Sequence, residues 1–378
     1  MLRLPARARA FSIGLALATA SLGMVPSIPA SASGSAITWN VQAGNVYPSF
    51  ADASQEITTF YNARTFVHPG DHVLFTPVGG HSVTFNPRRI PGVPTFAYAD
   101  PNFPAGPTGN TLSFANRPGG ALLNSGAITT PGFGGPPAPA TFTLDIGDDA
   151  AGASGGDSAT RAKGEAEGGG TTYQYFCMFH RDMTGFITVL PAGARLPFTS
   201  DQNDKRADSA KTADIARAKA ALRTASRDAE DNRVAAGLGV ASVQHAGATS
   251  ILRFAPDTIR IHVGDSVTWI NQDLNAPHTV TFGTELPDRS GVGPGFVPYG
   301  GTTVNSTGDQ VNSGWLISQQ LIDYVNADGS LLPSGYSPVR QVTFTFTKAD
   351  TYHYFCALHD FLGMVGTVIV SNDDSASG

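Results

Sequence analysis

Cysteine is almost absent from this chain, which has two Cys among 378 residues. Charge is also scarce, because only 14% of the residues are Asp, Glu, Lys or Arg and the net charge at pH 7 is −6. A chain of this charge is not expected to bind nucleic acid, which needs a basic surface. Two Cys in an exported protein usually form a disulfide, but their sequence context, described below, argues against that pairing.

Long hydrophobic runs are missing too. Phe11–Val25 is apolar but too short to span a bilayer. Three arginines precede this run and Ala30-Ser31-Ala32 follows it, which is the pattern of a secretory signal peptide over residues 1–32. No Cys follows for lipid attachment. We therefore expect a secreted, extracytoplasmic protein without a membrane anchor.

What the chain does have is an internal repeat. Thr172–Leu190 matches Thr351–Val370, and upstream Phe60–Phe85 matches Phe254–Phe282. Both upstream blocks run from a Gly-Asp turn through a strand-like segment to His followed by Val-Thr-Phe. Such self-similarity indicates two copies of one structural unit.

Within each copy, apolar and polar residues alternate, as in Val342–Phe346, and the 43 Gly and 26 Pro suit short strands joined by turns. This predicts an all-β fold made of two tandem Greek-key β-sandwich domains, at residues 35–192 and 241–371, joined by a mostly helical linker at 193–240.

Three segments depart from the repeat. The Pro- and Gly-rich stretch Pro87–Pro139 is expected to form long surface loops with little regular structure. The low-complexity stretch Gly147–Gly170 is expected to be disordered. Ala-rich Asp201–Ala236 favours helix, and we interpret it as a solvated spacer, with a partner-binding helix as the alternative.

Each copy combines an upstream His with a downstream Cys-x-x-His and a Met shortly after it. The candidate metal ligands are His81, Cys177, His180 and Met183 in the first copy, and His278, Cys356, His359 and Met364 in the second. Imidazole suits both oxidation states of copper, thiolate is soft enough for Cu(I), and a weak thioether adjusts the reduction potential. The pattern predicts two type 1 copper ions per chain.

These blocks resemble the cupredoxins, the blue copper proteins of the plastocyanin, azurin and amicyanin family. The spacing from Cys356 to Met364 is similar to the plastocyanin loop, and the shorter spacing from Cys177 to Met183 is similar to amicyanin. The resemblance implies that the backbone amides of Ser82 and Thr279 steady the ligand sulfur. A disulfide between the two Cys, or a role as buried apolar residues, is the less favoured alternative.

The resemblance implies single-electron transfer without catalysis. A copper buffering or delivery protein is the alternative, and a multicopper oxidase or nitrite reductase is less favoured. The sequence has no His-x-His pair, which oxidases of this kind need, and Phe176 and Phe355 stand where nitrite reductases carry a ligand His before Cys.

The expected partners are other extracytoplasmic redox proteins that dock transiently. In this family an apolar patch surrounds the second loop His, and Leu358, Phe361 and Leu362 would form it around His359. In the first copy Met178 and Phe179 would do so around His180. Because the two ligand loops differ in length, the two sites should also differ in reduction potential.

Overall fold

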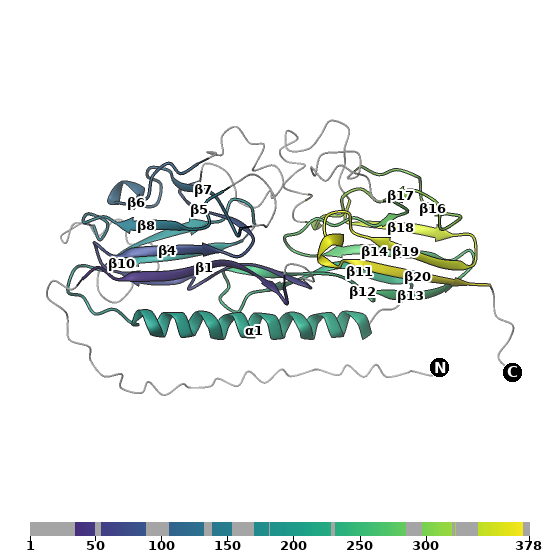
Figure 1. Cartoon of the computed structure of the whole chain (residues 1–378), viewed down its shortest axis with the longest axis horizontal. Coiled ribbons are helices and arrows are strands. Elements are labelled where there is room, and N and C mark those ends of the chain that lie inside the picture. Colours follow the sequence, from purple (N-terminus) through teal and green to yellow (C-terminus); the bar gives the residue numbers. More distant parts are fainter. Residues whose placement is uncertain are drawn as a thin grey trace, which may run out of the picture.

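The computed structural model describes residues 35–49, 54–87, 106–131, 138–152, 170–180, 182–227, 231–284, 297–319, 322 and 339–372. The expected signal peptide at 1–32 and most of the low-complexity stretch lie outside the described residues. The described chain is mostly β-sheet with one long α-helix (Figure 1). No helix among these residues is both long and apolar enough to cross a membrane.

The strands divide between an N-terminal half (35–192) and a C-terminal half (231–372). The N-terminal half holds β1 (Thr38–Tyr47), β2 (Gln55–Tyr61), β3 (Arg64–Val67), β4 (His72–Pro77), β5 (Gly80–Phe85), β6 (Thr111–Leu112), β7 (Leu123–Thr129), β8 (Phe142–Ile146), β9 (Thr171–Phe176) and β10 (Thr184–Val189). The C-terminal half holds β11 (Arg233–Ala241), β12 (Gly247–Ala255), β13 (Thr258–His262), β14 (Ser266–Gln272), β15 (Thr281–Phe282), β16 (Thr303–Val304), β17 (Val311–Asn312), β18 (Gln341–Phe346), β19 (Asp350–Phe355) and β20 (Val365–Ser371).

Each half has two layers with the same strand order. One layer runs β2-β1-β4-β8-β6 in the N-terminal half and β12-β11-β14-β18-β16 in the C-terminal half. The other layer runs β3-β10-β9-β5-β7 and β13-β20-β19-β15-β17. Within these layers β1 is parallel to β4 and antiparallel to β2, as β11 is to β14 and β12. The matching sequence blocks therefore fold into matching strands.

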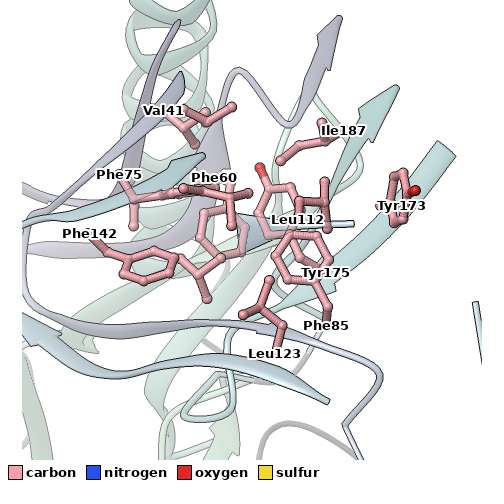
Figure 2. Close-up of a cluster of buried hydrophobic side chains, with 14 of the residues drawn as sticks. Val41, Phe60, Phe75, Phe85, Leu112, Leu123, Phe142, Tyr173, Tyr175 and Ile187 are labelled. Carbon is pink, nitrogen blue, oxygen red and sulfur yellow. The ribbon is translucent and has the colours of Figure 1, made fainter. Parts of the chain in front are cut away.

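A core of aromatic and aliphatic side chains fills the space between the layers of the N-terminal half (Figure 2). On β4, Val73 and Phe75 are buried and alternate with less buried neighbours, as expected for a strand with one face on a core. The Tyr175 ring packs edge-on against Phe60 and Phe75, with ring centroids 4.8 and 5.3 Å apart. This packing fixes β9, which ends directly before Cys177, against the opposite layer.

The two halves share one sheet. Strands β2 and β12 pair antiparallel, which joins their layers into a continuous ten-stranded sheet. The hydroxyls of Thr58 and Thr59 donate across the junction to the carbonyls of Ala248 and Ala246, each over 3.0 Å. The halves are therefore in direct contact along two buried strands.

The long helix α1 (Ser200–Arg227) runs under this sheet and beneath both halves (Figure 1). Helix was expected for this part of the chain, but the expected solvated spacer is wrong, because Ala207, Asp214 and Ala218 are buried. Ala207 packs with Ile57 of the N-terminal half. Ala218 packs with residues of β11 and β12 in the C-terminal half. The helix therefore covers the junction between the halves.

Residues 233–240, expected as part of the linker, form most of β11 instead. This strand pairs with both β12 and β14, so it is an inner strand of its sheet. Its Ala- and Gly-rich sequence lacks the large side chains that mark a strand. Ala235 and Leu238 pack against Ala218 of α1. Small residues on the helix-facing side of β11 let α1 approach closely. Because these residues are small, β11 lacks the large apolar side chains by which a strand is recognised in a sequence.

The Pro87–Pro139 segment, expected as loops, contains the buried strand β7. The Ser125 hydroxyl on β7 accepts a bond from the Val83 amide of β5 at 2.8 Å. In the C-terminal half, Ser313 accepts from Val280 in the same way at 2.8 Å. The matching Asn-Ser-Gly triplets therefore mark a strand that pairs with β5 in one half and β15 in the other.

Candidate metal centres

Three of the predicted ligands in the N-terminal half converge at one end of the sandwich. His81 lies on β5, Cys177 follows β9, and His180 lies in the turn before β10. The Cys177 Sγ atom is 3.8 Å from His81 Nδ1 and 3.4 Å from His180 Nδ1. All three ligand atoms lie within 4.8 Å of one another. We call these residues with Met183 the first centre.

The C-terminal half repeats this arrangement. Cys356 Sγ is 3.9 Å from His278 Nδ1 and 3.4 Å from His359 Nδ1, and the two Nδ1 atoms are 3.2 Å apart. We call these three residues with Met364 the second centre. In both centres each His turns the same nitrogen, Nδ1, toward the Cys sulfur, so four imidazoles share one orientation.

The two Met residues lie beside their Cys partners in the chain fold. The Cys177 amide donates to the Met183 carbonyl at 2.9 Å, and the Cys356 amide donates to the Met364 carbonyl at 3.0 Å. Both Met side chains are fully buried. Two imidazole nitrogens and one thiolate sulfur, with a buried Met bonded through its carbonyl to each Cys amide, are a donor set that fits copper in both of its common oxidation states.

The Cys sulfurs also accept bonds from backbone amides. The Ser82 amide lies 3.4 Å from Cys177 Sγ, and the Thr279 amide lies 3.3 Å from Cys356 Sγ. The hydroxyls of Ser82 and Thr279 in turn accept from the amide after each Cys at 2.8 Å. These are the two amides that the family resemblance implied. They hold each sulfur in place through the opposite strand.

Both Cys residues are free and buried, so they are not joined to each other. In the first centre, burial raises the pKa of the Cys177 thiol to about 11 and lowers the pKa of His81 to about 4. Burial, followed by repulsion from His81, also lowers the pKa of His180. Without metal, the first centre is therefore a set of neutral groups at pH 7.

In the second centre the pKa shifts of the Cys and of the upstream His run in the opposite direction. Burial opposes ionisation of Cys356, but His359 and His278 lower the pKa of its thiol well below the ordinary value. Burial alone would lower the pKa of His278, but its bond to Asp273 and the nearby Cys356 raise it to about 9. The surroundings of the second centre therefore favour the charged forms of Cys356 and His278, whereas those of the first centre favour the neutral forms of Cys177 and His81.

Sequence reasoning missed three residues at these centres, two glycines and one aspartate. Gly44 on β1 and Gly237 on β11 have φ of +77° and +76°, and a Cβ at either would overlap the Nε2 atom of His81 or His278. Asp273 is the third missed residue, with a buried carboxylate 3.2 Å from His278 Nε2. The glycines could have been noticed because each follows an Ala at the corresponding place in the two copies. Asp273 has no such signal, because it resembles an ordinary loop residue.

The expected apolar patch around the loop histidines is largely buried. Leu362 is 6% exposed and packs with Leu252, Ala276 and, from the N-terminal half, Val46. Met178 and Phe179 of the first centre are buried as well. These side chains were expected at the surface, but contacts between and within the halves cover them. Phe361 is different, because it is 52% exposed.

Comparison with known proteins agrees with this donor set. Residues 241–371 match the family described as copper binding proteins, plastocyanin/azurin family. The chain is 32% identical over 169 residues to chloroplastic plastocyanin of Tetradesmus obliquus, covering 93% of that protein and 41% of this chain. It is also 32% identical over 172 residues to the plastocyanin of Chlamydomonas reinhardtii, covering 95% of that protein and 42% of this chain.

Solved structures to which parts of the chain are similar include a purple cupredoxin from Nitrosopumilus maritimus and amicyanin from Paracoccus versutus. The first is 21% identical with a TM-score of 0.20, covering all of that chain and 37% of this one. The second is 19% identical with a TM-score of 0.20, covering 89% of that chain and 39% of this one.

Proposed function

The chain belongs to the plastocyanin/azurin family of copper-binding proteins, and we propose that it transfers single electrons through two mononuclear copper centres, one in each half. The observation that carries this proposal is the duplicated donor set, with two Nδ1 atoms and one Sγ atom within 4.8 Å in each half. These residues would hold copper in both of its oxidation states, and bound copper would supply one-electron chemistry.

The protein's part in this function is to hold the ligands still. The Sγ atoms of Cys177 and Cys356 each accept a hydrogen bond from a backbone amide. The backbone amide of each Cys also donates a hydrogen bond to the carbonyl of the Met that follows it. Tyr175 and Tyr354, two residues before each Cys, are fixed in the cores. Ligands held by both hydrogen bonds and core packing would move little between the two oxidation states of a bound metal. A small change in ligand geometry favours electron transfer over ligand exchange.

We further propose that the protein is exported and works outside the cytoplasm. The predicted signal peptide supports this, and no nucleic-acid partner is proposed for a chain of net charge −6. Copper buffering or delivery is the alternative function. The two differ in a measurable way, because a store passes copper to an acceptor, whereas a carrier keeps its copper through repeated oxidation and reduction.

The first test is metal content. Copper-loaded wild-type protein should hold two copper ions per chain and absorb intensely in the visible range through thiolate-to-copper bands. Cys177→Ser and Cys356→Ser should each lose one copper and part of the colour, since Ser keeps the size of Cys but removes the soft ligand. Metal analysis and an optical spectrum measure both.

The matched pair of variants is its own control, because each leaves the other centre intact. Finding one copper per wild-type chain, with full colour in Cys177→Ser, would rule out the first centre. Repeated cycles of oxidation and reduction, with copper released to a chelator at each cycle, would favour the storage alternative.

The second test concerns docking. Phe361, in the turn after His359, is a large exposed apolar side chain beside the second centre, and we propose it as the contact point for redox partners. In a Cys177→Ser background, Phe361→Glu should slow electron self-exchange between copies by about tenfold, the effect of losing one apolar contact of about 1.4 kcal/mol. NMR line broadening of mixed oxidised and reduced protein measures this rate.

Phe114→Glu is the matched control, since Phe114 is also exposed, at 37%, but lies in the other half. Equal rates for both variants would mean that electrons enter elsewhere. Leu362→Glu is unsuitable for this test, because it would bury a carboxylate between the halves.

A further inference from the structure

The two centres differ in what holds the far nitrogen of the upstream His. Nδ1 faces the Cys sulfur in both, which leaves Nε2 for a second partner. In the first centre His81 Nε2 lies 3.1 Å from the backbone carbonyl of Val78. In the second centre His278 Nε2 lies 3.2 Å from the Asp273 carboxylate. One partner is neutral and the other carries a negative charge.

Asp273 is held as firmly as a ligand would be. Its side chain and that of His278 are both fully buried. Its Oδ1 atom accepts bonds from the Ser250 hydroxyl at 2.8 Å and from the amides of Asn275 and Ala276 at 2.9 and 3.2 Å. With three donors on Oδ1, the other oxygen, Oδ2, is directed at His278. The carboxylate therefore has one orientation.

Both halves build this support. The Asn275 side chain donates to the Thr58 hydroxyl of β2 at 2.9 Å, across the junction. Glu56, also on β2, pairs with Ser250 and lies close enough to His278 and His359 to interact with them electrostatically. Burial is the main influence on Glu56 and raises its pKa. Asp273 is the carboxyl group that bonds directly to His278, a predicted ligand of the second centre.

We propose that Asp273 is a positioning residue that fixes the Nε2–H form of His278, presents its Nδ1 atom to the metal, and gives the second centre a lower reduction potential than the first. This rests on the proposed copper function. A carboxylate on the far N–H makes an imidazole a more basic ligand. Its negative charge also stabilises the more positive, oxidised metal. Val78 offers only a carbonyl dipole at the first centre, so electrons collect there.

The test is an optical redox titration of the copper-loaded full chain. Wild type should show two one-electron steps, and the Cys177→Ser variant should retain the lower of them. In Asp273→Asn, the three donors around Oδ1 keep the amide oxygen there, so the amide NH₂ faces His278 Nε2. Two donors then oppose each other, which should raise the second midpoint and leave the first unchanged. Copper affinity of the second centre should fall about 10- to 100-fold.

Ser250→Ala is the second variant, and it keeps the carboxylate. Without the Ser250 hydroxyl, the Asp273 carboxylate has one hydrogen-bond donor fewer, so its negative charge acts more strongly on His278. The reduction midpoint of the second centre should therefore fall. If Asp273 had only a structural role, Asp273→Asn and Ser250→Ala should shift the midpoint of the second centre in the same direction. In Cu(I)-loaded protein, nitrogen NMR should also find the Nε2–H proton of His278 in wild type and Ser250→Ala.

The outcomes separate the two proposals. If wild type binds no copper, the proposed function fails. If two coppers bind but the second centre has the higher midpoint, or Asp273→Asn moves neither midpoint, the role of Asp273 is overturned and the copper function stands. If Asp273→Asn loses its second copper, the Ser250→Ala variant still tests the proposal. A downward shift of its second midpoint supports the role of Asp273, and no shift or an upward shift overturns it.

Discussion

Gly237→Ala should reduce the copper content from two ions per chain to one. The φ of Gly237 is +76°, and its new Cβ would overlap the Nε2 and Cδ2 atoms of His278. Because His278 is fully buried, its ring cannot move aside without leaving Cys356. The second centre should therefore lose its visible band, while the first keeps its own. Metal analysis and the optical spectrum again measure the result.

Gly264→Ala separates this clash from backbone strain. Gly264 has a similar φ of +93°, but no atom lies within 4 Å of where its Cβ would be. This control should cost about 1 kcal/mol of stability, the usual price of a left-handed backbone, and keep both coppers. Two coppers and a wild-type spectrum in Gly237→Ala would contradict the expectation. Gly44→Ala should have the same effect at the first centre, where His81 takes the place of His278.

Asp214→Ala should lower the free energy of unfolding by about 3 kcal/mol or more. Asp214 on α1 is 1% exposed, and its carboxylate accepts bonds from the hydroxyls of Tyr61 and Ser242 and the amide of Val243, at 3.1, 2.7 and 2.7 Å. Removing it takes the acceptor from two buried hydroxyls and one partly buried amide, and each lost acceptor costs about 1–3 kcal/mol. Urea denaturation, with the midpoint and slope fitted together, measures the loss.

Asp208→Ala is the matched control, because Asp208 lies on the same helix with a side chain 73% exposed and forms a surface ion pair with Lys211. A surface pair of this kind is worth less than about 1 kcal/mol. If both variants lose the same stability, Asp214 does not join the helix to the halves. A change in slope alone would instead indicate that the halves no longer unfold together.

The sequence was most informative where the chemistry repeats. Cys356 and its two His partners could be predicted because a Cys-x-x-His motif recurs with the same upstream His, and the strands around it alternate regularly. The tyrosines before each Cys could not be assigned in the same way, since a core and an electron route both favour an aromatic residue. Their positions depend on packing against Phe60 or Trp269, which only the fold reveals.

The parts that could not be predicted depend on contacts between distant segments. Leu362 resembles a surface residue by its place beside His359, and only the neighbouring half, through Val46, makes it buried. Ala235 carries no strand signal because its small size serves contact with α1. Asp273 is one acid in a polar loop, and its importance comes from facing His278. For Leu362 and Ala235 the deciding partner is far away in the chain, whereas Asp273 and His278 are only five residues apart and meet because the loop between them folds back.

The junction between β2 and β12 has the form of a two-fold symmetric interface. Glu56 and Ser250 hold equivalent positions, four residues before the Phe that begins each matching block, and they face each other directly in the antiparallel register. Equivalent strands paired this way are what two identical subunits present to each other in a dimer. A separated half would therefore expose a self-complementary edge. Covalent linkage ensures that every molecule contains one half of each kind, so that the two unlike centres are always combined in a one-to-one ratio.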